Sequence, residues 1–359
     1  MNPNLAAFCA LGQSLWLDNI TRRILDDGTL ARWIDEYGLT GLTSNPTIFD
    51  EAIGGSDAYD AGIREKARAG KAGEALFVEL ALEDLRRAAK LFQPAHDATG
   101  GVDGWVSMEL SPLLADDTAA SIAAAQAIHD QAACRNLFVK IPGTPAGCGA
   151  IEESIFRGVP INVTLLFSTA QYLAAAEAYL RGIERRLAAG LDPAVESVAS
   201  VFVSRWDKAI AKTAPEALRN GLGIAVGMQC YREYRALLAS PRWKALEAAG
   251  ARPQRLLWAS TSTKDPAAPD TLYAVALAAP DTIDTLPAKT LEALADHGTA
   301  GAPMAVDGGD AEARLQRYAD AGIDVDALAK QLQDEGAKSF VDSWNQLLQR
   351  IRTKVETLS

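Results

Sequence analysis

The sequence is poor in the residues that build metal and redox sites. It has only three histidines, His96, His129 and His297, and they lie far apart in the chain. A histidine-based metal centre is therefore not expected. None of the four cysteines forms a CxxC pair, which argues against zinc-ribbon and thioredoxin-like proteins. We expect the cysteines to be reduced residues of the core.

The chain also lacks an excess of positive charge. Its net charge of −11 argues against nonspecific binding to nucleic acid or to an anionic membrane. The N-terminus has no basic segment followed by a long apolar run, so it does not read as a secretory signal. No apolar stretch is long enough to span a bilayer. The sequence predicts a soluble, cytoplasmic protein.

Nucleotide-binding motifs are absent as well. No GxGxxG follows the first predicted strand, and there is no GxxxxGK[ST]. The segment Gly143–Gly147 is glycine-rich, but its proline predicts a turn that leads into a helix. No cofactor is expected.

What the sequence does contain is a regular alternation of short apolar runs and longer helical patterns. Its 359 residues allow two domains or one large barrel. Strand–helix alternation predicts a parallel sheet, and eight repeats favour a closed (β/α)₈ barrel over an open doubly wound sheet, which stays an alternative. The predicted strands are Ser14–Asn19, Gly41–Asn45, Gly104–Leu110, Asn136–Ile141, Pro160–Leu166, Ser197–Ser204, Arg255–Thr261 and Asp281–Leu286.

The helical segments include additions to the simple barrel. Extra helices are expected around Gly73–Phe92, and two or more between Arg205 and Arg255. After the last strand, three further helices are predicted: Thr290–His297, Asp310–Ala321 and Asp324–Leu358. Because no linker isolates them, we expect one domain over residues 1–359. Its barrel core covers about 14–290, and the helical tail at about 290–359 packs on the barrel.

The alternation of side chains along each strand predicts which residues face the barrel lumen. Leu137, Val139 and Ile141 share one apolar face, so Lys140 points inward near the end of its strand. The same rule predicts that Trp258 and Ser260 face inward if Leu257 faces outward. The other inward polar or site-lining residues are Asp18, Thr43, Asn45, Ser107, Glu109, Asn162, Thr164, Ser200 and Phe202.

An inward lysine suggests imine chemistry. Loss of solvation favours its neutral amine, which can attack a carbonyl and form a Schiff base. The protonated imine then accepts electrons as the adjacent carbon–carbon bond breaks, and a base must take a proton from the hydroxyl on that bond. Asp18 or Glu109 could serve as this base, and Glu109 with Thr164 could handle water. The alternative is that Lys140 only forms an ion pair that fills the lumen.

Two segments resemble signatures of the transaldolase family. Gly41–Phe49 (GLTSNPTIF) resembles the first signature. Asn136–Thr144 (NLFVKIPGT) resembles the second, which carries the Schiff-base lysine. Three more segments look like the family's third, fifth and sixth strands, namely Val106–Glu109, Asn162–Ser168 and Ser200–Arg205. The resemblance runs in order from about residue 15 to 286, and the tail looks like that of the longer bacterial subgroup.

The resemblance implies a role for each matching residue. Lys140 matches the Schiff-base lysine, and Asp18 matches the acid/base that acts on the hydroxyl of the cleaved bond. Glu109 and Thr164 match the pair that holds the catalytic water. Residues at substrate-binding positions are Asn45, Asn162, Ser200 and Phe202, and those at phosphate-binding positions are Arg205 and Ser260.

One position departs from the family pattern. Many transaldolases have an arginine two residues after the phosphate-contacting serine, where this chain has Ser262. Lys264 follows two residues later and is our prediction for the second cation. The alternative for Lys264 is a solvated loop lysine.

Two other positions bear on the subfamily. Fructose-6-phosphate aldolases resemble transaldolases but tend to have Gln where this chain has Glu109, and Tyr where it has Phe202. The resemblance therefore implies transfer of a dihydroxyacetone unit from sedoheptulose 7-phosphate to glyceraldehyde 3-phosphate in the pentose phosphate pathway. The alternatives are a class I aldolase and a non-catalytic barrel that binds sugar phosphates. We expect small sugar phosphates as partners, and a monomer or homodimer.

Overall fold

A closed barrel of eight parallel strands forms the centre of the computed structural model, which describes residues 1–358. The strands pair in chain order, and β8 closes the barrel on β1. They are β1 (Ser14–Asp18), β2 (Gly41–Thr43), β3 (Trp105–Glu109), β4 (Leu137–Pro142), β5 (Ile161–Leu166), β6 (Ser197–Phe202), β7 (Gln254–Ala259) and β8 (Thr282–Leu286). The predicted (β/α)₈ barrel with its helical tail is confirmed, and the open sheet is excluded.

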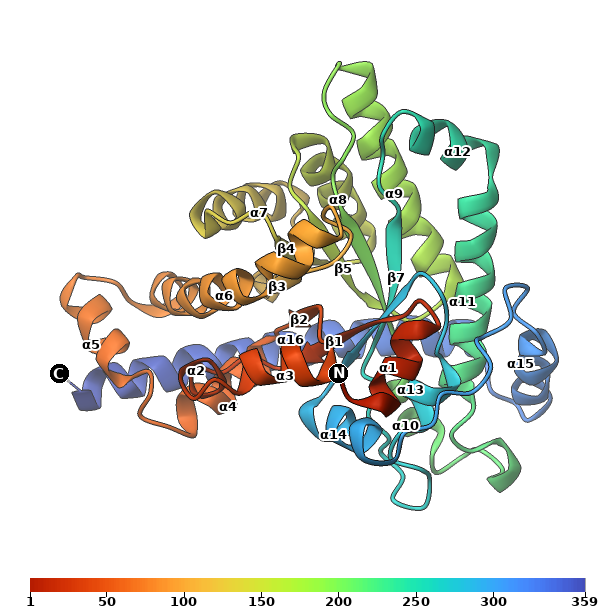
Figure 1. The fold of residues 1–359 in the computed structure, drawn as a ribbon. Coiled ribbons are helices and arrows are strands. Elements are labelled where there is room, and N and C mark those ends of the chain that lie inside the picture. The colour runs from red at the N-terminus through yellow and green to blue at the C-terminus, as the bar shows by residue number, and fades with distance from the viewer. Residues whose placement is uncertain (359) are drawn as a thin grey trace.

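Helices surround the barrel and join its strands (Figure 1). In the first half they are α1 (Pro3–Ala10), α2 (Arg22–Asp26), α3 (Thr29–Tyr37), α4 (Pro46–Gly54), α5 (Asp60–Arg68), α6 (Gly73–Ala98), α7 (Thr118–Ala132) and α8 (Pro145–Arg157). In the second half they are α9 (Thr169–Ala188), α10 (Ser204–Ile210), α11 (Leu222–Ala239), α12 (Pro241–Ala248), α13 (Leu272–Ala276), α14 (Ala288–His297), α15 (Ala311–Asp320) and α16 (Val325–Leu358).

Local sequence signals explain several helix ends. Ser168 caps α9, since its side chain accepts a hydrogen bond from the Gln171 amide. Thr144 caps α8 in the same way, with Pro145 as the first helical residue. Gly38 ends α3 in the left-handed conformation, with φ of 70°. Each of these ends depends on residues next to one another in the chain, so the signal for it is local.

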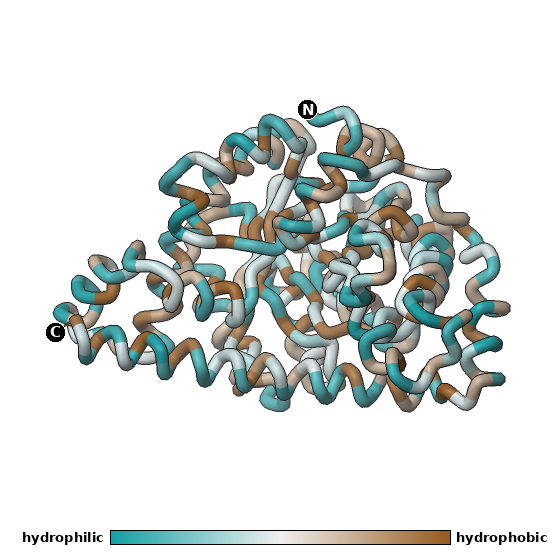
Figure 2. The backbone as a smooth tube through the Cα atoms, turned by 90° about the horizontal axis from the view of Figure 1, so that it is seen from below, coloured by the Kyte–Doolittle hydropathy of each residue, from teal (hydrophilic) through white to brown (hydrophobic). Residues whose placement is uncertain are grey.

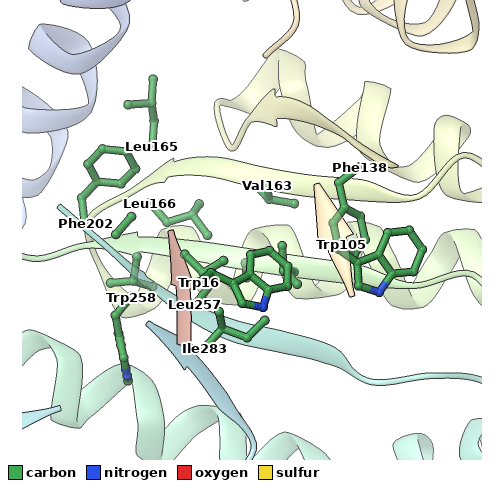
Figure 3. Close-up of a cluster of buried hydrophobic side chains, with 14 of the residues drawn as sticks. Trp16, Trp105, Phe138, Val163, Leu165, Leu166, Phe202, Leu257, Trp258 and Ile283 are labelled. Carbon is green, nitrogen blue, oxygen red and sulfur yellow. The ribbon is translucent and has the colours of Figure 1, made fainter. Parts of the chain in front are cut away.

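Aromatic side chains fill the lower part of the barrel lumen. Trp105 stacks on Phe138 with ring centroids 4.1 Å apart, and Trp16 lies next to them (Figure 3). The Trp16 ring packs so closely on β2 that a Cβ at Gly41 would lie 2.5 Å from it, so only glycine fits there. The site cavity described below lies above this aromatic layer, toward the carboxyl ends of the strands.

The prediction that Trp258 faces inward is wrong. Leu257 lies on the lumen side, where it lines the cavity described below. Trp258 points to the other side of β7, toward the helix layer, where it lies near Gly227 of α11 (Figure 3). Both faces of a barrel strand are buried, so two adjacent large apolar residues do not reveal from sequence which one faces inward.

The tail helix α16 lies across the molecule from α15 to α5 (Figure 1). Figure 2 shows hydrophobic and hydrophilic residues alternating along its length. Its buried face packs mainly on α4, α5, α6 and the end of β5. Near the C-terminus, Arg350 binds Asp50 of α4 and Lys354 binds Asp60 of α5. Within residues 1–358, no helix combines the length and apolar character needed to cross a membrane.

Candidate active site

A cavity of about 170 Å³ opens at the carboxyl ends of the strands. This end of a (β/α)₈ barrel is where catalytic groups gather. Most of the residues predicted for the site line it: Asp18, Asn45, Lys140, Thr164, Ser200, Phe202, Arg205, Ser260 and Lys264. Glu109 and Asn162 lie just behind this lining, and each contacts a residue of the cavity wall.

Lys140 and Glu109 form a buried ion pair inside the barrel. The register of β3 and β4 places them side by side, and Lys140 Nζ lies 2.7 Å from Glu109 Oε2. Lys140 also donates to the backbone carbonyl of Ser44 at 3.0 Å. Burial raises the pKa of Glu109, Lys140 opposes this shift, and the negative charge of Asp18 adds to it. The pair therefore joins an amine to a carboxyl group that is within reach for proton transfer and is more basic than an ordinary glutamate.

Asp18 is the last residue of β1. It accepts a hydrogen bond from Thr43, which in turn contacts Thr285. The Thr43 hydroxyl donates to Asp18 Oδ1 at 2.8 Å, and the Thr43 and Thr285 hydroxyl oxygens lie 2.7 Å apart. Because Thr43 gives its proton to Asp18, the proton of this second bond comes from Thr285. Burial raises the pKa of Asp18, while Lys140 and the bond from Thr43 lower it. The sequence placed Thr43 inward but did not suggest that it orients Asp18.

Polar residues of β3, β5 and β6 form a hydrogen-bonded chain beside the lysine. Ser200 Oγ donates to Asn162 Oδ1 at 2.7 Å, and Asn162 Nδ2 donates to Ser107 Oγ at 3.2 Å. The Thr164 hydroxyl is buried and has no hydrogen-bond partner among residues 1–358. Buried hydroxyls are normally paired, so this one is available to a substrate or water.

Asn45 lines the cavity and also caps a helix. Its Oδ1 accepts a hydrogen bond from the Ile48 amide at 3.0 Å and so caps the N-terminus of α4. Because its oxygen is engaged, only its amide nitrogen is left to donate into the cavity.

Arg205 brings a positive charge to the cavity. No carboxylate of residues 1–358 lies within ion-pair distance of it. Its guanidinium instead lies over the rings of Phe202, at 5.1 Å, and Phe340, at 6.0 Å. Burial lowers the pKa of Arg205, and the more distant charge of Glu335 on α16 opposes this shift. A partly buried arginine without an ion partner is a strong candidate for binding an anion.

Lys264 and Ser262 both reach the same cavity. The Lys264 amine donates to the Ser262 hydroxyl. Partial burial lowers the pKa of Lys264, and so do the nearby charges of Lys208 and Arg205. The Lys264 amine therefore lies beside position 262 at the cavity wall.

Ser260 reaches the cavity through its backbone conformation. Its φ of 56° turns the chain at the end of β7, and its hydroxyl lies 2.9 Å from that of Ser204. Ala259 and Ser260 therefore both line the cavity, although strict alternation would place them on opposite faces. Nothing in the sequence indicated this turn.

Sequence reasoning missed Phe340. It lies on α16, lines the cavity and contacts Arg205. Its position in a long amphipathic helix gave no sign of proximity to the site, because that proximity depends on how the tail folds back over the barrel.

Comparisons with known proteins agree with this geometry. The model of the transaldolase/fructose-6-phosphate aldolase family matches residues 15–351. The chain belongs to this family. The family match confirms the resemblance expected from the two signatures, and with it an enzyme of the transaldolase family.

Relatives that match along nearly the whole chain are named transaldolase. A transaldolase of Parafrankia sp. (strain EAN1pec) is 43% identical over 99% of both chains. One of Neisseria gonorrhoeae is 41% identical over 94% of this chain and 97% of its own. Transaldolase 2 of Nostoc punctiforme is 38% identical over 97% of this chain and 96% of its own.

Proposed function

We propose that this protein is a transaldolase that moves a dihydroxyacetone unit from sedoheptulose 7-phosphate to glyceraldehyde 3-phosphate. The products are erythrose 4-phosphate and fructose 6-phosphate, and the reaction belongs to the non-oxidative pentose phosphate pathway. The observation that carries this proposal is the buried Lys140–Glu109 pair in a cavity that also contains Asp18 and the unpaired Arg205.

The first stage is imine formation on Lys140. Its amine attacks the C2 carbonyl of the ketose and gives a carbinolamine. Before the attack, Glu109, 2.7 Å from Lys140 Nζ, takes a proton from the ion-paired ammonium, which leaves the neutral amine. Glu109 then gives this proton to the carbinolamine hydroxyl, which leaves as water, and the nitrogen keeps its own proton in the iminium. The unpartnered Thr164 hydroxyl can hold that water. The raised pKa of Glu109 makes its carboxylate a stronger base for the first proton transfer.

The second stage is cleavage of the C3–C4 bond. The carboxylate of Asp18 removes the proton from the C4 hydroxyl, the bond electrons move to the iminium nitrogen, and the aldose leaves. An enamine of the three-carbon unit stays on Lys140. It then attacks the aldehyde of the acceptor, Asp18 returns its proton to the new hydroxyl, and hydrolysis of the imine frees the product. Thr43 keeps the Asp18 carboxylate oriented throughout.

Arg205, Ser260 and Lys264 form the proposed phosphate site, with Arg205 as the main anchor. The guanidinium can bind a phosphate through two parallel hydrogen bonds. Asn45, Asn162 and Ser200 are proposed to bind the substrate's hydroxyl groups, and Phe202 provides an apolar wall. The cytoplasmic location and the monomeric or homodimeric state stay predictions.

Borohydride trapping tests the chemistry. Radiolabelled fructose 6-phosphate plus borohydride should place label on Lys140 of the native protein and none on Lys140→Ala. Unlabelled native protein, or equal labelling of the variant, would remove imine catalysis. Turnover of fructose 6-phosphate that requires erythrose 4-phosphate supports a transferase, whereas release of dihydroxyacetone without an acceptor identifies an aldolase.

A further inference from the structure

The tail helix α16 contributes one face to the mouth of the barrel. Gln333, Gly336 and Phe340 lie on successive turns, and all three are buried. Residues three and four apart share one side of a helix, so these three form a single surface. Each of them contacts a group at the carboxyl end of the barrel, as the contacts below show.

Gln333 fixes the helix to the strand ends. Its Nε2 donates to the backbone carbonyl of Gly143 at 3.1 Å and to that of Leu165 at 3.0 Å. Gly143 follows β4, which carries Lys140, and Leu165 lies in β5, next to Thr164. Leu165 has a φ of 59°, in a part of β5 where the pairing with β6 is irregular. The hydrogen bond from Gln333 to Leu165 therefore connects α16 to the end of β5, where the backbone of Leu165 has a conformation unusual for leucine.

Gly336 allows the helix to approach Arg205. A glycine within a long helix is unfavourable relative to alanine, so it needs a packing reason. A Cβ at this position would lie 2.9 Å from Leu165 Cδ2 and 3.1 Å from Arg205 Nη1. Both distances are shorter than ordinary van der Waals contact. The missing side chain thus makes room for the guanidinium and for Leu165 together.

Phe340, one turn further along, supplies a second aromatic face to Arg205. The guanidinium lies over Phe202 from β6 and over Phe340 from α16. A carboxylate partner would hold an arginine equally well, but it would occupy the N–H groups and cancel the charge. Aromatic faces hold the planar group and leave its N–H donors free for an anion.

We propose that Gly336 and Phe340 of α16 are positioning residues that hold Arg205 ready for the substrate phosphate and so set the preference for phosphorylated sugars. The proposal rests on the proposed function, since it takes Arg205 as the phosphate anchor. It gives the tail helix a part in specificity, through contacts on one face of two helical turns.

Paired substitutions at Phe340 test this role. Phe340→Leu keeps an apolar side chain but removes the ring, and Phe340→Tyr keeps the ring. With the leucine variant we expect KM for fructose 6-phosphate and Ki for inorganic phosphate to rise about three- to tenfold, the loss expected for one cation–π contact. The tyrosine variant should restore most of the phosphate affinity. With the leucine variant, kcat at saturating fructose 6-phosphate should fall by less than KM rises.

Gly336→Ala independently tests the second residue of α16 that lies against the Arg205 guanidinium. It should weaken inhibition by inorganic phosphate, because the added Cβ would lie 3.1 Å from Arg205 Nη1 and would displace the guanidinium. Ser339→Ala is the matched control, an exposed position on the same helix, and should leave this inhibition unchanged.

The outcomes separate the two proposals. If Arg205→Ala leaves phosphate inhibition unchanged, Arg205 is not the anchor and the proposed phosphate site fails. If Arg205→Ala weakens phosphate inhibition but Phe340→Leu and Gly336→Ala do not, only the positioning role is overturned. A fall in kcat with KM and phosphate affinity both unchanged would also overturn it, because it would indicate a purely structural role.

Discussion

A buried carboxyl group outside the active site gives a quantitative prediction about stability. Asp284 lies on β8 next to Trp258 of β7 and is fully buried. Neither of its oxygens has a hydrogen-bond partner among residues 1–358, and the nearby Thr261 hydroxyl donates to the Thr285 carbonyl instead. Burial raises the pKa of Asp284 to about 7, against a smaller opposing effect of Thr261.

The magnitude follows from linkage. An aspartate in the unfolded chain has a pKa of about 3.9, so a folded value of about 7 corresponds to about 4 kcal/mol. The folded state binds more protons than the unfolded state between these two values. This group therefore makes the protein less stable as pH rises from about 4 to 7, and its full cost is present above pH 7.

Asp284→Asn removes the charge and keeps the shape. At pH 8 the variant should be more stable than the native protein by up to about 4 kcal/mol, or about 5 °C in Tm for a chain of this length. At pH 5 the two proteins should differ much less, because Asp284 is then neutral. Denaturant unfolding at both pH values measures the difference. Asp342→Asn, at an exposed position of α16, controls for the loss of a carboxylate.

The reasoning would be refuted if the stability difference between Asp284→Asn and the native protein were the same at pH 5 and pH 8. That result would mean that Asp284 titrates alike in the folded and unfolded states. A variant less stable at both pH values by a constant amount would point to the cost of burying the amide instead.

Four further predictions concern the active site. Asp18→Ala should still form the borohydride-trapped imine but slow cleavage about 10²- to 10⁴-fold, and equal loss of both steps would contradict its assigned role. Because burial raises the pKa of Asp18, the acid limb of the native kcat profile should lie above the ordinary aspartate range, and kcat should fall as pH drops through it. Glu109→Gln should slow imine formation and hydrolysis more than bond cleavage, which single-turnover kinetics can resolve. Arg205→Ala should raise KM for phosphorylated substrates about 10- to 100-fold, whereas an unchanged KM would show that it is not the anchor.

Much of the site could be predicted because strand geometry is local. Side chains of a strand alternate between its two faces, so the apolar residues Leu137, Val139 and Ile141 were enough to place Lys140 in the lumen. The same rule placed Asp18 and Glu109 there correctly. It failed for Leu257 and Trp258, because a pair of large apolar residues fits either face of a doubly buried strand. It also gave no sign of the left-handed turn at Ser260.

The sequence alone determined the order of strands and helices, the main helix caps and the inward direction of most catalytic groups, since each depends on neighbouring residues. Only the tertiary structure decided which of these groups touch. The barrel register places Glu109 beside Lys140, and it brings Thr43 of β2 next to Asp18 of the adjacent strand β1. The return of α16 brings Phe340 to Arg205 across 135 positions of the chain. Such contacts depend on the closure and packing of the whole chain, which a local pattern does not contain.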